Sequence, residues 1–321
     1  MDEWENAIAT PEELYGTPDS VEMQSSHTIA GPGTREYLIR FQSPSPHVGD
    51  TAFARVYEPV QSEEESVESK QELPTLIFGS GLGTMNDSLV YWPEEEYIGR
   101  RLAPAGIRVV LPEPPWSGRR ELPGSYSGEP YLARAPVGTF QLYGAQVQET
   151  ALLTDWARSK GSETVAVGGM SLGGIVTAFV IAHSGSWPDH MRPDMAFPIA
   201  FSTEIDRLLQ QSTITDLLGV TDALAESGWT PDRLQALAPL LRATGEPGIP
   251  ADQIYPFAGT EDDAALFDLA EATLDEWGVP AGNRTIWPTD HFGVYFKALR
   301  ENRIQERLLV EIQSTTQKQM P

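Results

Sequence analysis

The sequence of 321 residues has no cysteine and few basic residues. Without cysteine, a disulfide framework, a thiolate nucleophile, an iron–sulfur cluster and a cysteine zinc site are all excluded. Acidic residues outnumber basic ones by 46 to 22, and the formal net charge is −24. Because nucleic acids and anionic membrane surfaces are bound through Lys and Arg, we expect neither as a partner.

Lysine is the scarcest of the charged residues. Only 4 of the 22 basic residues are lysines, and the other 18 are arginines. Many acids with few lysines suggest a halophilic protein, since salt screens the repulsion among like charges; an acidic protein of ordinary salt tolerance is the alternative. Residues 1–16 lack the features of a signal peptide, and no run reaches the roughly 18 apolar residues of a membrane span. We therefore expect a cytoplasmic protein with no integral membrane segment.

Composition and turn residues divide the chain into five predicted parts. Residues 1–34 are polar without a clear period, which predicts a loosely docked N-terminal arm. Residues 35–204 and 251–313 are predicted to form one α/β core, with residues 205–250 inserted between them as a helical lid or cap. Residues 314–321 are predicted to be a C-terminal tail. Within the first core part, the charged and serine-rich residues 61–72 predict a solvated or disordered loop.

Strands and helices alternate along the predicted core. The predicted strands lie at 36–41, 51–59, 73–78, 107–111, 164–167, 195–201, 253–257 and 284–287. The predicted helices lie at 97–105, 140–160, 172–183, 264–277 and 293–312. Helices of this length between strands are typical of parallel sheets. The pattern predicts an α/β fold with a mostly parallel central sheet and helices on both faces.

One motif carries a specific chemistry. Residues 169–173 read G-M-S-L-G, the only G-x-S-x-G in the sequence. The predicted strand 164–167 enters the motif and the predicted helix 172–183 leaves it, which is the context of a nucleophile elbow. The glycines allow the sharp turn and the close approach of helix and strand. The pattern therefore predicts Ser171 as a nucleophile at the start of a helix.

A serine needs a base to remove its proton, and histidine is the usual one. His291 follows the last predicted strand, and a loop at that edge of a parallel sheet lies above the central turn. His27 and His47 come before the core, which is the wrong order for a Ser…Asp…His arrangement. His183 ends the helix after Ser171 and should point away from it, and His190 lies in the next loop. We therefore predict His291 as the base.

The acid that orients the histidine is expected after the preceding strand. The G-x-x-D at 259–262 puts Asp262 at a strand-to-loop turn. Asp263 and Glu261 are neighbouring alternatives, and Glu204 and Asp206 are more distant ones. A solvated acidic loop is the structural alternative for this segment.

Acyl transfer also needs backbone donors for the oxyanion. The first predicted donor is the N–H of Leu172, directly after the nucleophile. The second is predicted in the turn after strand 73–78, at Leu82, with Ser80 or Gly81 as alternatives. This turn reads G-S-G-L-G-T and cannot complete the G-x-G-x-x-G of a dinucleotide site. The sequence has no phosphate loop and no metal-ligand spacing, so we expect neither a cofactor nor a metal.

These motifs resemble those of the α/β-hydrolase superfamily over residues 73–313. More narrowly, the sequence is similar to the abhydrolase-domain-containing group numbered eighteen. That likeness is carried by L-P-E-P-P-W-S-G at 111–118, the helix 144–156 with Glu149, and G-M-S-L-G-G at 169–174. The sequence departs from the group at 79–83, where the group usually has G-T-G-D-H. The resemblance implies serine hydrolase chemistry without indicating a substrate.

Two further segments border the predicted site. The insertion carries leucines at helical spacing, which predicts either a helical layer on the core or an apolar acyl pocket. The loop 112–139 carries Arg119, Arg120 and Arg134. Ion pairing with acids is the first interpretation of these arginines, and binding of a substrate carboxylate or phosphate is the second.

The sequence as a whole predicts a serine hydrolase that acts on an ester of a small-molecule acyl substrate. An acyltransferase with the same residues, or a non-catalytic binding protein of the same fold, are the alternatives, and a homo-oligomer is possible. An amide or thioester substrate is a second choice.

Overall fold

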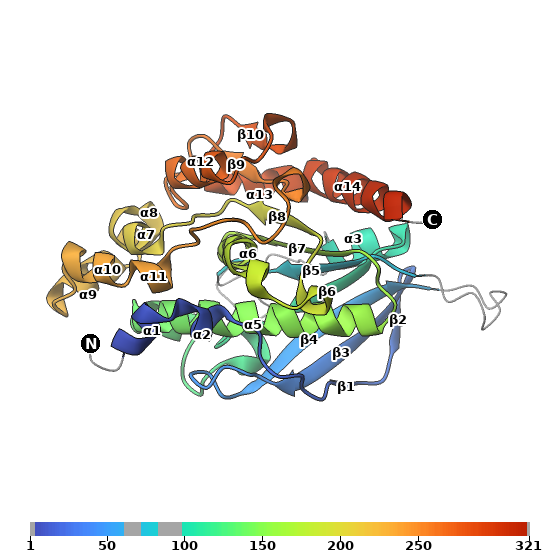
Figure 1. Ribbon diagram of the computed structural model, residues 1–321, viewed down its shortest axis with the longest axis horizontal. Coiled ribbons are helices and arrows are strands. Elements are labelled where there is room, and N and C mark those ends of the chain that lie inside the picture. The colour runs from blue at the N-terminus through green and yellow to red at the C-terminus, as the bar shows by residue number, and fades with distance from the viewer. Residues whose placement is uncertain (1–3, 61–71, 83–97, 320–321) are drawn as a thin grey trace.

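One central sheet organises the computed structural model, which describes residues 4–60, 72–82 and 98–319. In these residues ten strands pair in the order β1-β3-β4-β6-β5-β7-β8-β9-β10, with β2 also on β3 (Figure 1). The strands are β1 (Gln24–Ser25), β2 (Ile29–Gly31), β3 (Thr34–Gln42), β4 (Thr51–Pro59), β5 (Thr75–Gly79), β6 (Arg108–Pro112), β7 (Val165–Met170), β8 (Met195–Ile199), β9 (Phe257–Gly259) and β10 (Thr285–Trp287). Strands β5 to β10 are parallel, and β1 to β4 are antiparallel. The predicted mostly parallel sheet is confirmed.

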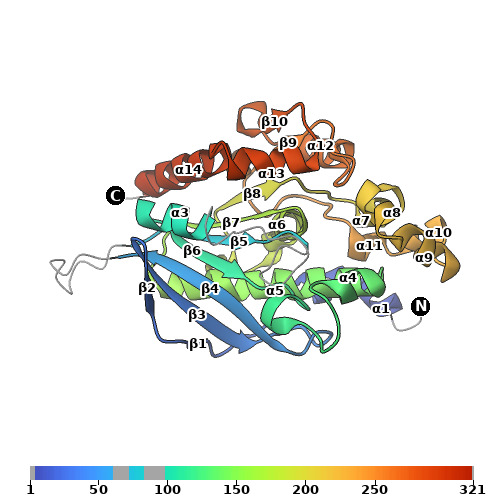
Figure 2. The ribbon, with the colours of Figure 1, turned by 180° about the vertical axis from the view of Figure 1, so that it is seen from behind.

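Helices cover both faces of the sheet. They are α1 (Glu5–Ala9), α2 (Pro11–Tyr15), α3 (Arg100–Leu102), α4 (Glu129–Ala133), α5 (Val137–Ser159), α6 (Leu172–His183), α7 (Ile205–Gln211), α8 (Thr213–Leu217), α9 (Val220–Glu226), α10 (Pro231–Ala236), α11 (Ala238–Leu241), α12 (Phe267–Glu276), α13 (His291–Leu299) and α14 (Arg303–Gln319). One apolar core contains α5 and α6, and a second contains α3, α13 and α14. Figure 2 shows these two helical layers on opposite sides of the strands. None of the described helices is long and apolar enough to span a membrane.

The cap, residues 205–250, lies between β8 and β9 and contains α7 to α11, at one end of the molecule in Figure 2. Most of its leucines are buried against the core, whereas Leu217 and Leu218 on and after α8 are exposed. A bidentate ion pair between Arg242 and Asp206 joins the two ends of the cap, with nitrogen–oxygen distances of 2.8 and 2.7 Å. The cap is therefore packed as a helical layer, with its base closed by an ion pair.

The N-terminal segment is not a loosely docked arm, so that prediction is wrong. Leu14 and Tyr15 are buried, and β1 and β2 pair with β3. The Tyr15 hydroxyl donates to the Leu240 carbonyl at 2.5 Å, and Trp187 Nε1 donates to the Tyr15 carbonyl at 3.2 Å. A few apolar side chains in a polar segment suffice to anchor it, which a reading of average polarity misses.

Several predicted boundaries also need correction. The predicted helix 293–312 is two helices, α13 and α14, separated at Asn302, which has a positive φ of 55°. The predicted tail 314–321 is wrong up to residue 319, because α14 extends that far. The strand predicted at 253–257 begins only at Phe257; before it, Ile254 forms an isolated parallel bridge with Ala196 of β8. The predicted loop 61–72 and the start of the predicted helix 97–105 lie largely outside the described residues.

Candidate active site

The turn at Ser171 joins the buried strand β7 to helix α6. Ser171 has a φ of 55°, a conformation that L-residues rarely adopt. The space around it is closed to side chains: a Cβ on Gly173 would lie 2.2 Å from the Gly79 carbonyl oxygen, and one on Gly169 would lie 2.4 Å from the Gly173 carbonyl. Strained backbone held by close glycine contacts is the arrangement expected of a nucleophile elbow.

Ser171, His291 and Asp262 lie in one hydrogen-bonded chain. His291 Nε2 is 3.0 Å from Ser171 Oγ, and His291 Nδ1 is 2.8 Å from Asp262 Oδ2. His291 is the first residue of α13 after β10, and Asp262 follows β9, so both come from the carboxyl edge of the sheet. With its proton on Nδ1, the imidazole donates to Asp262 and accepts from the serine hydroxyl, which is the geometry of a general base.

Asp262 is held by the backbone of its own loop. Its Oδ1 accepts hydrogen bonds from the N–H groups of Ala264 at 3.1 Å and Ala265 at 2.7 Å. Asp262 and His291 are buried, with exposed fractions of 5% and 4%. The two amides and His291 together satisfy both carboxylate oxygens, which orients the acid toward the ring. Backbone donors have no side-chain signature, so the sequence could not reveal them.

The alternative acids lie elsewhere. Asp263 Oδ1 accepts a hydrogen bond from Thr213 Oγ1 of the cap at 3.0 Å, and Asp263 is exposed, as is its neighbour Glu261. Glu204 and Asp206 both pair with Arg242 at the base of the cap. None of these described carboxylates is paired with His291.

Two other histidines pack against aromatic rings. His183 stacks on Tyr15 with ring centroids 4.4 Å apart, and burial lowers its pKa to about 4. The histidine whose ring nitrogen lies beside Ser171 Oγ is His291. His47 lies with its ring centroid 5.2 Å from that of Trp4. His183 and His47 therefore contribute to packing between aromatic side chains.

The turn after β5 lies against the elbow. Gly79 pairs with Gly169 across β5 and β7, and the Gly173 N–H donates to the Ser80 carbonyl at 3.0 Å. Leu172 is the first residue of α6, so its N–H is in the first helical turn. The Leu82 side chain packs on Gly128, because a Cβ on that glycine would lie 2.6 Å from Leu82 Cδ1. The oxyanion role of the Leu172 and Leu82 N–H groups stays a prediction, as do the alternatives Ser80 and Gly81.

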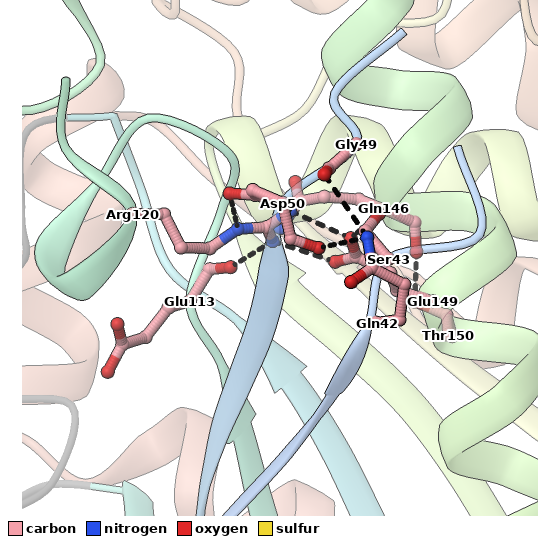
Figure 3. A network of polar contacts seen from close by, with 9 residues as sticks. All are labelled: Gln42, Ser43, Gly49, Asp50, Glu113, Arg120, Gln146, Glu149 and Thr150. Carbon is pink, nitrogen blue, oxygen red and sulfur yellow. Dashed lines mark hydrogen bonds and ion pairs between the residues drawn. The ribbon is translucent and has the colours of Figure 1, made fainter. Parts of the chain in front are cut away.

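Arg120 belongs to a buried polar network rather than to a surface. All five N–H donors are used, as Figure 3 shows. Nε and Nη2 donate to Asp50, Nη1 and Nη2 donate to Glu149, and Nη1 also donates to the Glu113 carbonyl, all at 2.8–2.9 Å. The side chain has no exposed surface, so it is not available to a substrate anion. The network joins the β3–β4 connection, α5 and the loop after β6.

The other two arginines of this loop also have partners within the chain. Arg119 forms an ion pair with Glu113. Arg134 donates to Gln141 at 3.3 Å and lies over the ring of Trp116, 5.6 Å from its centroid. The ion-pairing interpretation therefore holds for Arg119. Substrate binding by Arg119 or Arg134 stays a prediction.

A metal site is not formed by the described part of the chain. No group of three or more His, Asp or Glu side chains in residues 4–60, 72–82 and 98–319 could hold a metal ion.

No protein-family model and no curated protein matches the sequence. Solved structures do match. An acetyl xylan esterase from Paenibacillus sp. R4 is 14% identical with a TM-score of 0.58, covering 95% of this chain and 92% of that one. An S-formylglutathione hydrolase from Agrobacterium tumefaciens is 14% identical with a TM-score of 0.53, covering 92% and 99%. A hyperthermophilic esterase from the archaeon Pyrobaculum calidifontis is 17% identical with a TM-score of 0.51, covering 98% and 92%.

The chain has the α/β-hydrolase fold. The three similar structures are named as hydrolases or esterases and cover nearly the whole chain. In this α/β-hydrolase fold, the elbow at Ser171 occupies the centre of the sheet, between β5 and β8 on either side of β7. At such low identities the likeness concerns the fold alone.

Proposed function

We propose that the protein is a serine hydrolase that cleaves esters through an acyl-enzyme. The observation that supports this most is the hydrogen-bonded chain from Ser171 Oγ through His291 to Asp262 Oδ2. A non-catalytic binding protein would not need these three groups in contact, one of them on strained backbone. The similar esterases make an ester the first substrate class to test. The narrower likeness to the abhydrolase group numbered eighteen belongs to this proposal as well.

The reaction would proceed in two halves. Ser171 Oγ attacks the acyl carbon while His291 Nε2 accepts its proton, and the N–H groups of Leu172 and Leu82 stabilise the oxyanion. The imidazolium then donates that proton to the departing alcohol, leaving an acyl group on Ser171. Water attacks this ester with His291 again as the base, which releases the acid and restores the serine. Asp262 keeps the imidazole in the required tautomer and stabilises its cation.

A fluorophosphonate probe tests the proposal directly, because it reacts with an activated serine. We expect labelling of the wild type and none of Ser171→Ala, with Ser186→Ala, a change at an exposed serine, labelled like the wild type. Turnover of a p-nitrophenyl ester should fall by about 10⁴-fold or more in Ser171→Ala. Because we propose that the acidic surface is adapted to salt, both assays are run in dilute and in concentrated NaCl, with circular dichroism as a folding control.

Absence of labelling in a folded wild type would contradict the proposal and favour the binding-protein alternative. Labelling together with acyl transfer to an added alcohol in preference to water would favour the acyltransferase.

A further inference from the structure

The cap contacts the loop that carries the proposed catalytic acid. Ser212 and Thr213 lie where α7 ends and α8 begins. Ser212 Oγ donates to the Ala264 carbonyl at 2.6 Å, and the Thr213 N–H donates to the Asp263 carbonyl at 3.2 Å. Ser212 is buried, with an exposed fraction of 1%, so bulk water cannot replace its hydrogen bond. The cap is thus bonded to the two residues that follow Asp262.

Both contacts act on peptide groups that also hold Asp262. The Ala264 carbonyl, which accepts from Ser212, shares a peptide group with the Ala265 N–H, which donates to Asp262 Oδ1 at 2.7 Å. The Asp263 carbonyl, which accepts from the Thr213 N–H, shares a peptide group with the Ala264 N–H, which donates to the same oxygen at 3.1 Å. Each of two consecutive peptide groups therefore has the cap at one end and the carboxylate at the other.

This arrangement transmits the position of the cap to the acid. A peptide group is planar and rigid, so a hydrogen bond at its carbonyl also fixes the direction of its N–H. A hydrogen bond to the carbonyl further polarises the N–H and strengthens its bond to the carboxylate. Asp262 Oδ2 in turn lies 2.8 Å from His291 Nδ1, so the orientation of the carboxylate sets that of the imidazole.

We propose that Ser212, together with the Thr213 N–H, positions the catalytic acid, so that the cap is required for catalysis as well as for covering the core. The inference rests on the proposed serine hydrolase function and deepens it. Ser212 is a positioning residue that acts through Asp262, not a residue that touches the substrate. The sequence suggested Asp263 as an alternative acid. In this inference Asp263 contributes instead through its backbone carbonyl, which accepts from the Thr213 N–H of the cap.

The test is ester hydrolysis by Ser212→Ala and Ser212→Gly. We expect kcat to fall about fivefold in both, the effect of losing roughly one hydrogen bond from the transition state, with KM unchanged. Ser212 is also the N-cap residue of α8, because its Oγ accepts from the Ile214 N–H. The alanine variant therefore also loses this helix N-cap hydrogen bond. Glycine at a helix N-cap costs much less helix stability than alanine does. The glycine variant therefore separates the loss of the bond to Ala264 from the loss of the helix N-cap better than the alanine variant.

Thr230→Ala is the matched control. Thr230 is the N-cap residue of α10, where its Oγ1 accepts from the Arg233 N–H at 3.3 Å, and none of the hydrogen bonds among the described residues joins it to the loop of Asp262. We expect its kcat to equal that of the wild type. A double-mutant cycle then tests the route: in an Asp262→Asn background, Ser212→Gly should lower kcat no further.

Three results would overturn the inference while the wild type remains active. They are an unchanged kcat in both Ser212 variants, an equal loss in Thr230→Ala, and a full further loss in the Asp262→Asn background. A rise in KM with constant kcat would also overturn it, because Ser212 would then act on substrate binding. A wild type that neither hydrolyses esters nor reacts with the fluorophosphonate overturns the proposed function itself and this inference with it.

Discussion

Removal of Arg120 should destabilise the protein more than removal of any exposed arginine. In Arg120→Met, Glu149 would keep only the hydrogen bond from Ser43 Oγ at 2.6 Å, while its side chain remains 3% exposed. Leaving such a carboxylate unpaired costs about 3–5 kcal/mol. Asp50 is 31% exposed and can be rehydrated, so its share is about 1 kcal/mol or less. We therefore expect a total loss of about 4 kcal/mol.

Calorimetry at constant salt measures this loss as a fall in Tm. An unfolding entropy of about 2.1 cal/mol/K per residue gives roughly 0.7 kcal/mol/K for a chain of this length, so the expected fall is roughly 6 °C. The control is Arg303→Met, which removes an exposed ion pair with Glu301 and should cost about 1 kcal/mol or less.

The double variant Arg120→Met/Glu149→Met separates the charge from the packing. Two apolar side chains of similar volume can replace a buried ion pair without loss, so the double variant should regain most of the stability that Arg120→Met loses. A loss below about 1 kcal/mol in the single variant, or a double variant no more stable than the single one, would refute this reasoning.

Two further changes test the packing around the elbow. Gly173→Ala places a Cβ 2.2 Å from the Gly79 carbonyl oxygen and should lower the free energy of unfolding, measured by chemical denaturation, by about 3 kcal/mol or more. The control Gly282→Ala, with nothing within 4 Å of its Cβ, should stay within about 0.5 kcal/mol of the wild type. Equal losses in the two variants would contradict the close approach of Gly173 to Gly79. Burial lowers the pKa of His183 to about 4 from an ordinary 6.5, so between these values the unfolded chain binds a proton that the folded chain does not. The free energy of unfolding therefore decreases as the pH is lowered from 6.5 to 4. In His183→Phe, which keeps a ring stacked on Tyr15, the loss between pH 7 and 4.5 should be smaller by roughly 2 kcal/mol, and an unchanged pH dependence would contradict this.

The elbow and its partners could be predicted because their signals are local and ordered along the chain. A buried strand, a G-x-S-x-G and an apolar helix follow one another within about 20 residues around Ser171. Parallel strands then bring the loops of Asp262 and His291 to the same edge, whatever the details of the helices between them. The structure places these three side chains within hydrogen-bonding distance of one another.

Features that depend on distant contacts or on backbone atoms escaped prediction. Tyr15 bonds to a carbonyl 225 residues away, and nothing in the composition of residues 1–34 indicates that anchor. The amides of Ala264 and Ala265 hold Asp262 without any side-chain signature. Arg120 was a candidate for either ion pairing or substrate binding, and only the three-dimensional meeting of Asp50 and Glu149 decides between them.

Several arginines neutralise buried acids, which assigns the charge imbalance to the remaining acids of the chain. Six of them pair with carboxylates of side chains at most 5% exposed: Arg35 and Arg108 with Glu58, Arg100 with Glu36, Arg119 with Glu113, Arg120 with Glu149 and Arg242 with Asp206. A planar guanidinium with five donors suits such sites better than an ammonium group, which gives a structural reason for part of the preference for arginine over lysine. The charges of these groups nearly cancel, so the formal net charge of −24 is left to the remaining side chains. Because salt screens exposed charges far more than buried ones, added salt should relieve the surface repulsion and leave the buried pairs intact.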